Sequence, residues 1–176
     1  QGAGLSGSFF FFSQDNRFLI KTVNEVEIKL LLSMLDDMIN HFEATNNKSL
    51  LARIYGVFTI KTDFFDNLNI VVMQNTIKMK NPSNKKMIFD IKGSTTNRKV
   101  KGLTRFRKNN LHSKTVLKDI NYLEINQELN YSLLTLEESQ KIELEELIKL
   151  DSMFLRDHNL MDYSLLLVIE QAGENR

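Results

Sequence analysis

The stretch Gly2-Ala3-Gly4-Leu5-Ser6-Gly7, followed at once by the apolar run Phe9–Phe12, decides the fold class of this chain. Its glycines satisfy G-x-G-x-x-G, a pattern that binds dinucleotides when a strand precedes it and a helix follows. Here the following segment is strand-like, so the dinucleotide interpretation lacks its structural context. A glycine loop ahead of a strand can instead bring backbone N–H groups close to phosphates, because no Cβ blocks the approach. Residues 1–8, rich in glycine and serine, are expected to form a loop, and the alternative to the phosphate-binding role is a flexible chain end.

Working outward, the apolar and turn-forming residues predict an α+β chain that begins with an antiparallel sheet. The turn cluster Ser13–Asn16 separates two strand-like runs and predicts a β-hairpin. Asn24 and Glu27 form a capping pattern that starts a helix, and Thr135 and Glu138 form a second one. The predicted strands are 9–12, 17–22, 51–62, 69–73, 87–92 and 163–169; the predicted helices run from 24 to 42 and from 135 to 157; residues 93–115 are expected to be irregular.

The composition of the 176 residues excludes several classes of protein. A hydrophobic share of 42% is enough for a core, which argues against a disordered chain. There is no cysteine, so disulfides, zinc fingers and cysteine nucleophiles are excluded. The 3 histidines show no metal-ligand spacing. No apolar run approaches the ~18–20 residues that span a bilayer, and no signal peptide is visible after Gln1.

The net charge of +1 conceals a strongly basic segment. Residues 78–118 carry 13 basic side chains and 1 acidic one, a net charge of +12, whereas residues 119–176 have a net charge of −9. Such asymmetry predicts an anionic partner. An anionic membrane fits better than nucleic acid, because the segment has few aromatic residues and no nucleic-acid-binding module. A solvated loop over residues 99–114 is the alternative interpretation.

Lys21 ends the second predicted strand, and Glu27 follows it in the predicted helix. A lysine at such a strand end can neutralise nucleotide phosphates beneath a glycine loop. Glu27 could orient this lysine, or it could cap its own helix at Asn24, and the third helical position is compatible with both roles. The alternative for Lys21 is a solvated lysine at the end of a strand.

Two blocks in the second half of the chain identify a family. The first reads Phe89-Asp90-Ile91-Lys92-Gly93-Ser94-Thr95 and is followed by Arg98; the second reads Met161-Asp162-Tyr163-Ser164-Leu165-Leu166. They resemble the D-L-K-G-S-T-x-x-R and M-D-Y-S-L-L signatures of the phosphatidylinositol phosphate kinases, of the phosphatidylinositol-4-phosphate 5-kinase type. The glycine loop, the Ile20-Lys21-Thr22 strand end, Glu27 and Val71–Asn75 follow the same order, so the resemblance runs almost end to end.

The resemblance implies a two-lobed lipid-kinase fold like that of protein kinases. We expect an N-lobe with an antiparallel sheet over residues 1–72, a hinge over 73–77 and an incomplete C-lobe over 78–176. The family pattern continues to an I-I-D motif whose aspartate binds Mg²⁺, and this sequence contains no such motif. We therefore expect a truncated catalytic domain whose metal ligand lies beyond Arg176. A catalytically inactive module that binds phosphoinositide or nucleotide is the alternative.

The implied reaction transfers the γ-phosphate of ATP, with Mg²⁺, to an inositol-ring hydroxyl of a phosphatidylinositol monophosphate at a membrane. Asp162, which alone would be only a turn residue before a strand, takes the catalytic-aspartate position, and Lys92 is the second catalytic candidate. The residues expected at ATP are Gly4, Ser6, Gly7, Ser8, Lys21, Glu27, Gln74 and Asn75. The residues expected at the substrate phosphates are Asp90, Lys92, Gly93, Ser94 and Arg98. Arg98 suits a ring phosphate, because its planar fork binds bidentately.

The resemblance also implies a location and a set of partners. We expect a cytoplasmic protein, peripheral at the cytoplasmic face of anionic membranes such as the plasma membrane. No transmembrane span and no nucleic acid are expected, and a homodimer is a candidate assembly. The sequence leaves open which inositol hydroxyl is modified.

Overall fold

The computed structural model describes residues 2–3, 8–63, 67–81, 83–102, 113 and 115–171. The chain divides into two compact units. Unit 1 comprises Gln1–Thr76 and Ile142–Asn159, and unit 2 comprises Ile77–Lys141 and Leu160–Arg176. Helices and strands are mixed in the described part of the chain, which confirms the predicted α+β class. None of the described helices combines the length and the apolar character that crossing a bilayer requires.

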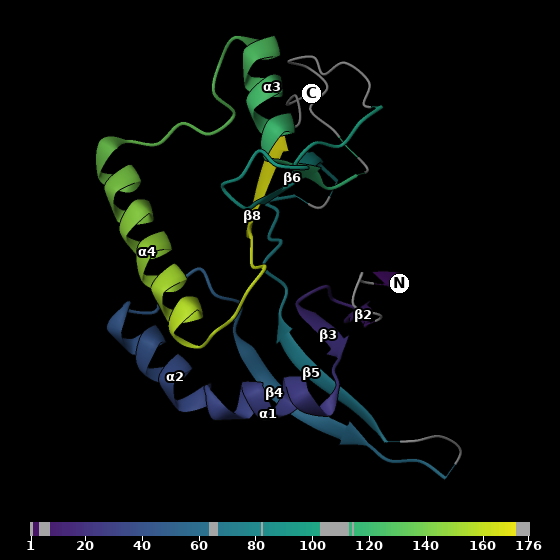
Figure 1. The fold of residues 1–176 in the computed structure, drawn as a ribbon. Helices are drawn as coiled ribbons and strands as arrows, with labels where there is room; N and C mark the ends of the chain where they lie inside the picture. Colours follow the sequence, from purple (N-terminus) through teal and green to yellow (C-terminus); the bar gives the residue numbers. More distant parts are fainter. Residues whose placement is uncertain are drawn as a thin grey trace. The chain divides into compact units, whose positions relative to one another are not determined.

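Unit 1 contains a sheet that is antiparallel throughout, with the strand order β1-β2-β3-β5-β4 (Figure 1). The strands are β1 (Gly2–Ala3), β2 (Phe9–Phe12), β3 (Phe18–Thr22), β4 (Ile54–Ile60) and β5 (Leu68–Gln74). The predicted hairpin is confirmed as β2 and β3. Its turn is held by Ser13, whose hydroxyl donates to Asp15 Oδ1 at 2.6 Å and accepts from the Phe18 N–H at 3.0 Å.

The prediction of a loop over residues 1–8 is wrong at Gly2–Ala3, which forms β1. These two residues pair with Phe10 and Phe9 of β2. The edge of β2 carries backbone N–H and C=O groups that seek partners, and even a two-residue strand satisfies some of them. Local composition favoured a loop, and the pairing with a later segment overrides it.

The single helix predicted from 24 to 42 is also wrong, because the structure has two helices. They are α1 (Glu25–Ser33) and α2 (Leu35–Ala44), and they are separated at Met34. Met34 has φ −106° and ψ 0°, and its N–H donates to the Leu31 carbonyl at 3.3 Å, three residues back instead of four. The Met34 side chain is buried, so the break places an apolar side chain in the interior of unit 1.

Helix α4 (Glu138–Asp157) contributes its C-terminal part to unit 1. Its buried residues are Asp151 and Phe154. The ring of Phe154 packs on His41 of α2 with the centroids 4.8 Å apart. The predicted capping pattern at Thr135 is wrong by two residues. The helix starts later, where the Glu137 N–H donates to Gln140 Oε1 at 3.0 Å.

Unit 2 is built around a three-stranded sheet with the order β7-β6-β8. The strands are β6 (Lys85–Ile91), β7 (Leu117–Lys118) and β8 (Leu165–Gln171), and helix α3 (Asp119–Leu129) follows β7. β6 pairs parallel to β7 and antiparallel to β8. The core is the buried cluster Met87, Phe89, Leu117 and Ile125, in which Met87 and Phe89 alternate along β6 as a strand requires. The predicted bounds 87–92 and 163–169 differ from β6 and β8 by one or two residues at each end.

No helix or strand was expected over residues 116–134, where the structure has β7 and α3. The apolar residues of α3 do not recur at a clear helical spacing. The start of the helix is instead held by a contact with a residue that is distant in sequence. Asn121 is buried; its side chain accepts from the Val100 N–H at 2.9 Å and donates to the Val100 carbonyl at 3.0 Å. The amide therefore completes both backbone hydrogen bonds of a residue far upstream, and this anchors the start of α3.

Candidate functional site

The first group of candidate residues lies in unit 1, where β3 leads into α1. Lys21 Nζ donates to Glu27 Oε1 at 2.8 Å. The other carboxylate oxygen of Glu27 accepts from the Asn24 N–H at 2.9 Å, and the Asn24 side chain accepts from the Glu27 N–H at 2.9 Å. Glu27 thus orients the lysine and completes a reciprocal capping box at the same time, so the structure contains both arrangements considered for it.

The environment of Glu27 keeps its carboxylate charged. Burial raises the pKa of Glu27, but the hydrogen bonds from Lys21 and from the Asn24 backbone outweigh burial and hold that pKa below 4.5. The two side chains are 24% (Lys21) and 33% (Glu27) exposed. The ammonium group is therefore held in one place while part of it faces solvent, which is an arrangement that can meet an anionic ligand.

The other residues predicted at ATP are described only in part. Gly4, Ser6 and Gly7 lie outside the described residues, and Ser8 is buried. Gln74 is the last residue of β5, and its N–H donates to the Arg53 carbonyl at 2.7 Å. Asn75 ties the chain to the β2–β3 hairpin, because its backbone N–H and its side-chain amide donate to the Arg17 and Asn16 carbonyls at 3.0 and 2.8 Å.

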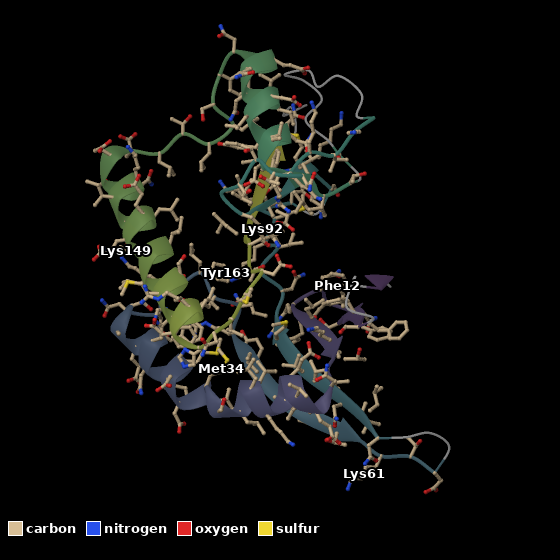
Figure 2. The ribbon with its side chains drawn as sticks, in the orientation of Figure 1. Phe12, Met34, Lys61, Lys92, Lys149 and Tyr163 are labelled. Atoms are coloured by element: carbon tan, nitrogen blue, oxygen red, sulfur yellow. The ribbon has the colours of Figure 1, made fainter. Side chains whose placement is uncertain are left out.

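The second group lies in unit 2, at the end of the sheet where β6 ends and β8 begins. Ile91 of β6 pairs with Leu165 of β8, so Lys92 and the residues just before Leu165 come together. Lys92 Nζ forms an ion pair with Asp162 Oδ1 (Figure 2 labels Lys92). This hydrogen bond and the positive charge of Lys92 hold the pKa of Asp162 below its usual range. The Asp162 side chain is 90% exposed, so its carboxylate remains accessible to a reactant.

Arg98 lies between two carboxylates of unit 2. Its Nη2 donates to Asp90 Oδ1 at 2.6 Å and to the Asp90 carbonyl, and its Nε donates to Asp119 Oδ2 at 2.7 Å. Asp90 belongs to β6 and Asp119 is the first residue of α3. The predicted residues thus form two ion pairs near the end of β6, Lys92 with Asp162 and Arg98 with Asp90.

Asp119 is a residue that the sequence analysis missed. Its Oδ1 accepts from three successive backbone N–H groups, those of Lys92, Gly93 and Ser94, at 3.0, 2.8 and 3.4 Å. Burial would raise the pKa of Asp119, but the Arg98 hydrogen bond and the backbone N–H groups lower it to about 2. One signal in the sequence could have found it: Asp119 is the first acidic residue after Asp90, directly after the basic segment 78–118.

The backbone around Gly93 explains why a glycine stands there. Gly93 has φ +69°, and a Cβ added to it would meet no heavy atom within 4 Å. The requirement is therefore the left-handed backbone conformation and not space. This conformation turns the N–H groups of Gly93 and Ser94 toward Asp119, so these two donors are used within the protein.

Comparisons with known proteins identify the family of the chain. The profile of the phosphatidylinositol-4-phosphate 5-kinase family matches residues 1–176. The chain is 38% identical over 170 residues to phosphatidylinositol 4-phosphate 5-kinase 9 of Arabidopsis thaliana, a match that covers 97% of this chain and 19% of the relative. It is 33% identical over 170 residues to phosphatidylinositol 4-phosphate 5-kinase its3 of Schizosaccharomyces pombe, with 97% and 21% covered. The chain thus spans about a fifth of the length of these curated relatives, and it belongs to the phosphatidylinositol-4-phosphate 5-kinase family.

Proposed function

We propose that the protein containing this chain transfers the γ-phosphate of ATP to an inositol-ring hydroxyl of a phosphatidylinositol monophosphate, which yields a bisphosphate. The observation that carries the proposal is the ion pair between Lys92 and Asp162 at the shared end of β6 and β8. An exposed carboxylate beside a fixed ammonium is what phosphoryl transfer to a hydroxyl needs, because the carboxylate orients the hydroxyl and the ammonium neutralises phosphate charge.

Each group of residues has a proposed role. Lys21, oriented by Glu27, holds ATP phosphates, with Gly4–Ser8 and the backbone near Gln74 and Asn75 completing the nucleotide site. Asp162 accepts the proton of the attacking hydroxyl, and its lowered pKa keeps it deprotonated at neutral pH. Lys92 and Arg98 provide positive charge for phosphate groups, and Asp90, Gly93 and Ser94 shape that part of the site. In this proposal residues 1–72 are the N-lobe, 73–77 the hinge and 78–176 part of the C-lobe of a kinase-like fold.

ATP and Mg²⁺ are the proposed cofactors. Lys21 is suited to ATP, because a held and partly exposed ammonium fits a phosphate. Among the described residues, no three His, Asp or Glu side chains lie together in a way that could hold a metal ion. No residue of this chain is therefore assigned to Mg²⁺, which would neutralise phosphate charge when bound.

The proposed setting is the cytoplasmic face of an anionic membrane. The basic segment 78–118, with its net charge of +12, supplies the attraction. Basic residues near an anionic surface contribute about 1 kcal/mol each and lose this contribution at high salt. Binding to vesicles that contain phosphatidylinositol monophosphate should therefore weaken steeply between low and physiological salt.

The test of the reaction uses the full-length protein, ATP and vesicles containing a phosphatidylinositol monophosphate. Asp162→Asn should lower kcat by about 10²–10⁴-fold, the usual contribution of a catalytic acid or base. Asp162 has φ +63°, which Asn tolerates well, so the variant keeps the backbone conformation. Asp157→Asn is the matched control, because Asp157 is an exposed aspartate paired with Arg156 at 2.7 Å. An Asp162→Asn enzyme as fast as the wild type would disprove the assignment.

A further inference from the structure

We propose that Asp119 is a positioning residue of this site: its buried carboxylate fixes the turn at 92–94 and the guanidinium of Arg98, and thereby directs Lys92 toward Asp162. The inference rests on the proposed function and assigns it an additional residue. Asp119 need not touch a reactant, since it acts through the groups that it holds.

Three backbone donors converge on one oxygen of Asp119. The N–H groups of Lys92, Gly93 and Ser94 all point to Asp119 Oδ1, at 3.0, 2.8 and 3.4 Å. Successive N–H groups arranged in this way form a concave anion site, and elsewhere such sites bind phosphates. In this chain the anion is a side chain of the protein. The turn is therefore already ordered before any ligand arrives, and its order depends on the Asp119 charge.

The second step is the position of Arg98. Asp119 Oδ2 accepts from Arg98 Nε at 2.7 Å, and Asp90 accepts from Arg98 Nη2 at 2.6 Å. Charge-assisted hydrogen bonds on two sides fix the plane of the guanidinium. The Ile120 N–H also donates to the Arg98 carbonyl at 3.0 Å, which attaches the backbone of this residue to α3. Each oxygen of one carboxylate thus holds a different part of the 92–98 segment.

The third step concerns what the Lys92 side chain gains. Its ammonium reaches Asp162 from a backbone whose own N–H is held by Asp119. If the backbone at residue 92 loosened, the ammonium would sample more positions, and a displacement of about 1 Å in a reacting group can lower a rate by roughly 10²-fold. Asp119 should therefore affect the catalytic step more than the binding of ATP, since Lys21 and Glu27 lie in unit 1.

Asp119→Asn separates the two functions of the carboxylate at the level of atoms. The amide has one acceptor oxygen and one NH₂ donor, so it cannot accept both from the three backbone N–H groups and from Arg98 Nε–H. Whichever side keeps the oxygen, the other meets an NH₂ group. Shape and size are retained, and what is lost is the negative charge and one set of hydrogen bonds.

Asp151 provides a matched control for a purely structural effect. It is a buried aspartate of α4 in unit 1, 5% exposed against 8% for Asp119. It likewise accepts several donors: Leu50 N–H at 2.7 Å, Ser49 Oγ at 2.7 Å and His41 Nε2 at 2.6 Å. Asp151→Asn therefore removes a similarly buried and similarly bonded carboxylate that holds none of the candidate catalytic residues.

The experiment compares the two variants in the full-length protein. For Asp119→Asn we expect kcat for phosphatidylinositol monophosphate in vesicles to fall by about 10–100-fold, with the KM for ATP changed by less than about twofold. Hydrogen exchange of the peptide covering residues 92–98 should accelerate, because this segment loses the carboxylate charge and one of its two sets of hydrogen bonds to residue 119, either that of the three amides or that of Arg98. For Asp151→Asn we expect a comparable fall in thermal stability with kcat and exchange at 92–98 close to wild type.

Several results would overturn the inference. These are an Asp119→Asn enzyme with wild-type kcat, equal losses of kcat in the two variants, or unchanged exchange at 92–98. If Asp119→Asn does not fold, Asp119→Glu decides, since it keeps the charge but displaces the carboxylate; wild-type kcat in that variant counts against the proposal. If the wild-type protein phosphorylates no phosphoinositide, the proposed function is wrong. Hydrogen exchange at residues 92–98 would still report separately on the effect of Asp119 on the turn.

Discussion

Glu27→Gln is the most informative change, because the two hydrogen bonds of Glu27 differ in what they need. Glutamine keeps an oxygen that accepts from the Asn24 N–H, as in a capping box with Gln at the third helical position. It loses the negative charge that holds Lys21 at 2.8 Å. The variant therefore removes the orientation of Lys21 and leaves the start of α1 capped.

The structure sets the expected magnitudes. The two side chains are a quarter to a third exposed, so solvent screens the ion pair and its loss should lower the free energy of unfolding by only about 0.2–1 kcal/mol. If Lys21 holds ATP phosphates, its disorder should lower kcat/KM for ATP by about tenfold or more, which corresponds to at least ~1.4 kcal/mol of transition-state stabilisation. The kinetic loss should then exceed the loss of stability.

The assay measures initial rates at several ATP concentrations together with denaturant unfolding of the same preparations. Asn24→Ala is the control: it deletes the acceptor of the Glu27 N–H, should destabilise the protein by about 1 kcal/mol, and leaves the Lys21–Glu27 pair in place. Its ATP kinetics should match the wild type. Unchanged ATP kinetics in Glu27→Gln, or an equal kinetic loss in Asn24→Ala, would refute the assignment of Lys21.

Three further outcomes are expected. The hydrogen bonds from His158 to the Phe154 carbonyl and to Asp37 raise the pKa of His158 above 6.5. The contribution of His158 to stability is therefore complete below pH 6.5 and is lost as the pH rises through the raised pKa. Asp37→Asn should lower the pKa of His158 in an NMR titration. The pKa of Asp119, lowered from 3.8 to about 2, should contribute about 2 kcal/mol to the free energy of unfolding above pH 4. In the wild type this contribution should be lost as the pH falls from about 4 to about 2. Asp119→Asn should not show this loss. Phe89→Ala should destabilise the protein by about 3–5 kcal/mol in denaturant unfolding, because Phe89 is fully buried against Tyr122, whereas the exposed Phe58 should cost far less when replaced.

The parts of the fold that depend on neighbouring residues were predictable from the sequence. The β2–β3 hairpin follows from the turn chemistry of Ser13–Asn16, and the capping box from Asn24 and Glu27. The break at Met34 was not predictable, because its neighbours are ordinary helical residues and its side chain becomes buried only in the folded unit. The same reason hid α3, whose anchor Asn121 bonds to Val100.

In the candidate site, too, some residues were predictable from local sequence and one was not. Asp90, Lys92, Arg98 and Asp162 were identified because they stand in continuous motifs. Asp119 escaped, since its partners lie 21 to 27 positions earlier in the chain and only the fold brings them to its carboxylate. The signal that Asp119 leaves in the sequence, its place as the first acidic residue after the basic segment 78–118, does not reveal which groups it holds.

The division of the chain into two discontinuous units has a consequence for the order in which the protein folds. The chain leaves unit 1 after Thr76 and returns to it at Ile142, and β6 finds its long partner β8 only near the end, where Met87 pairs with Ile169. During synthesis, the backbone edge of β6 that pairs with β8 therefore stays unpaired until Leu165–Gln171 has emerged from the ribosome. Contacts so distant in sequence make folding slow and leave a newly made chain open to aggregation. A chaperone would protect β6 most effectively if it were recruited before residue 165 is synthesised.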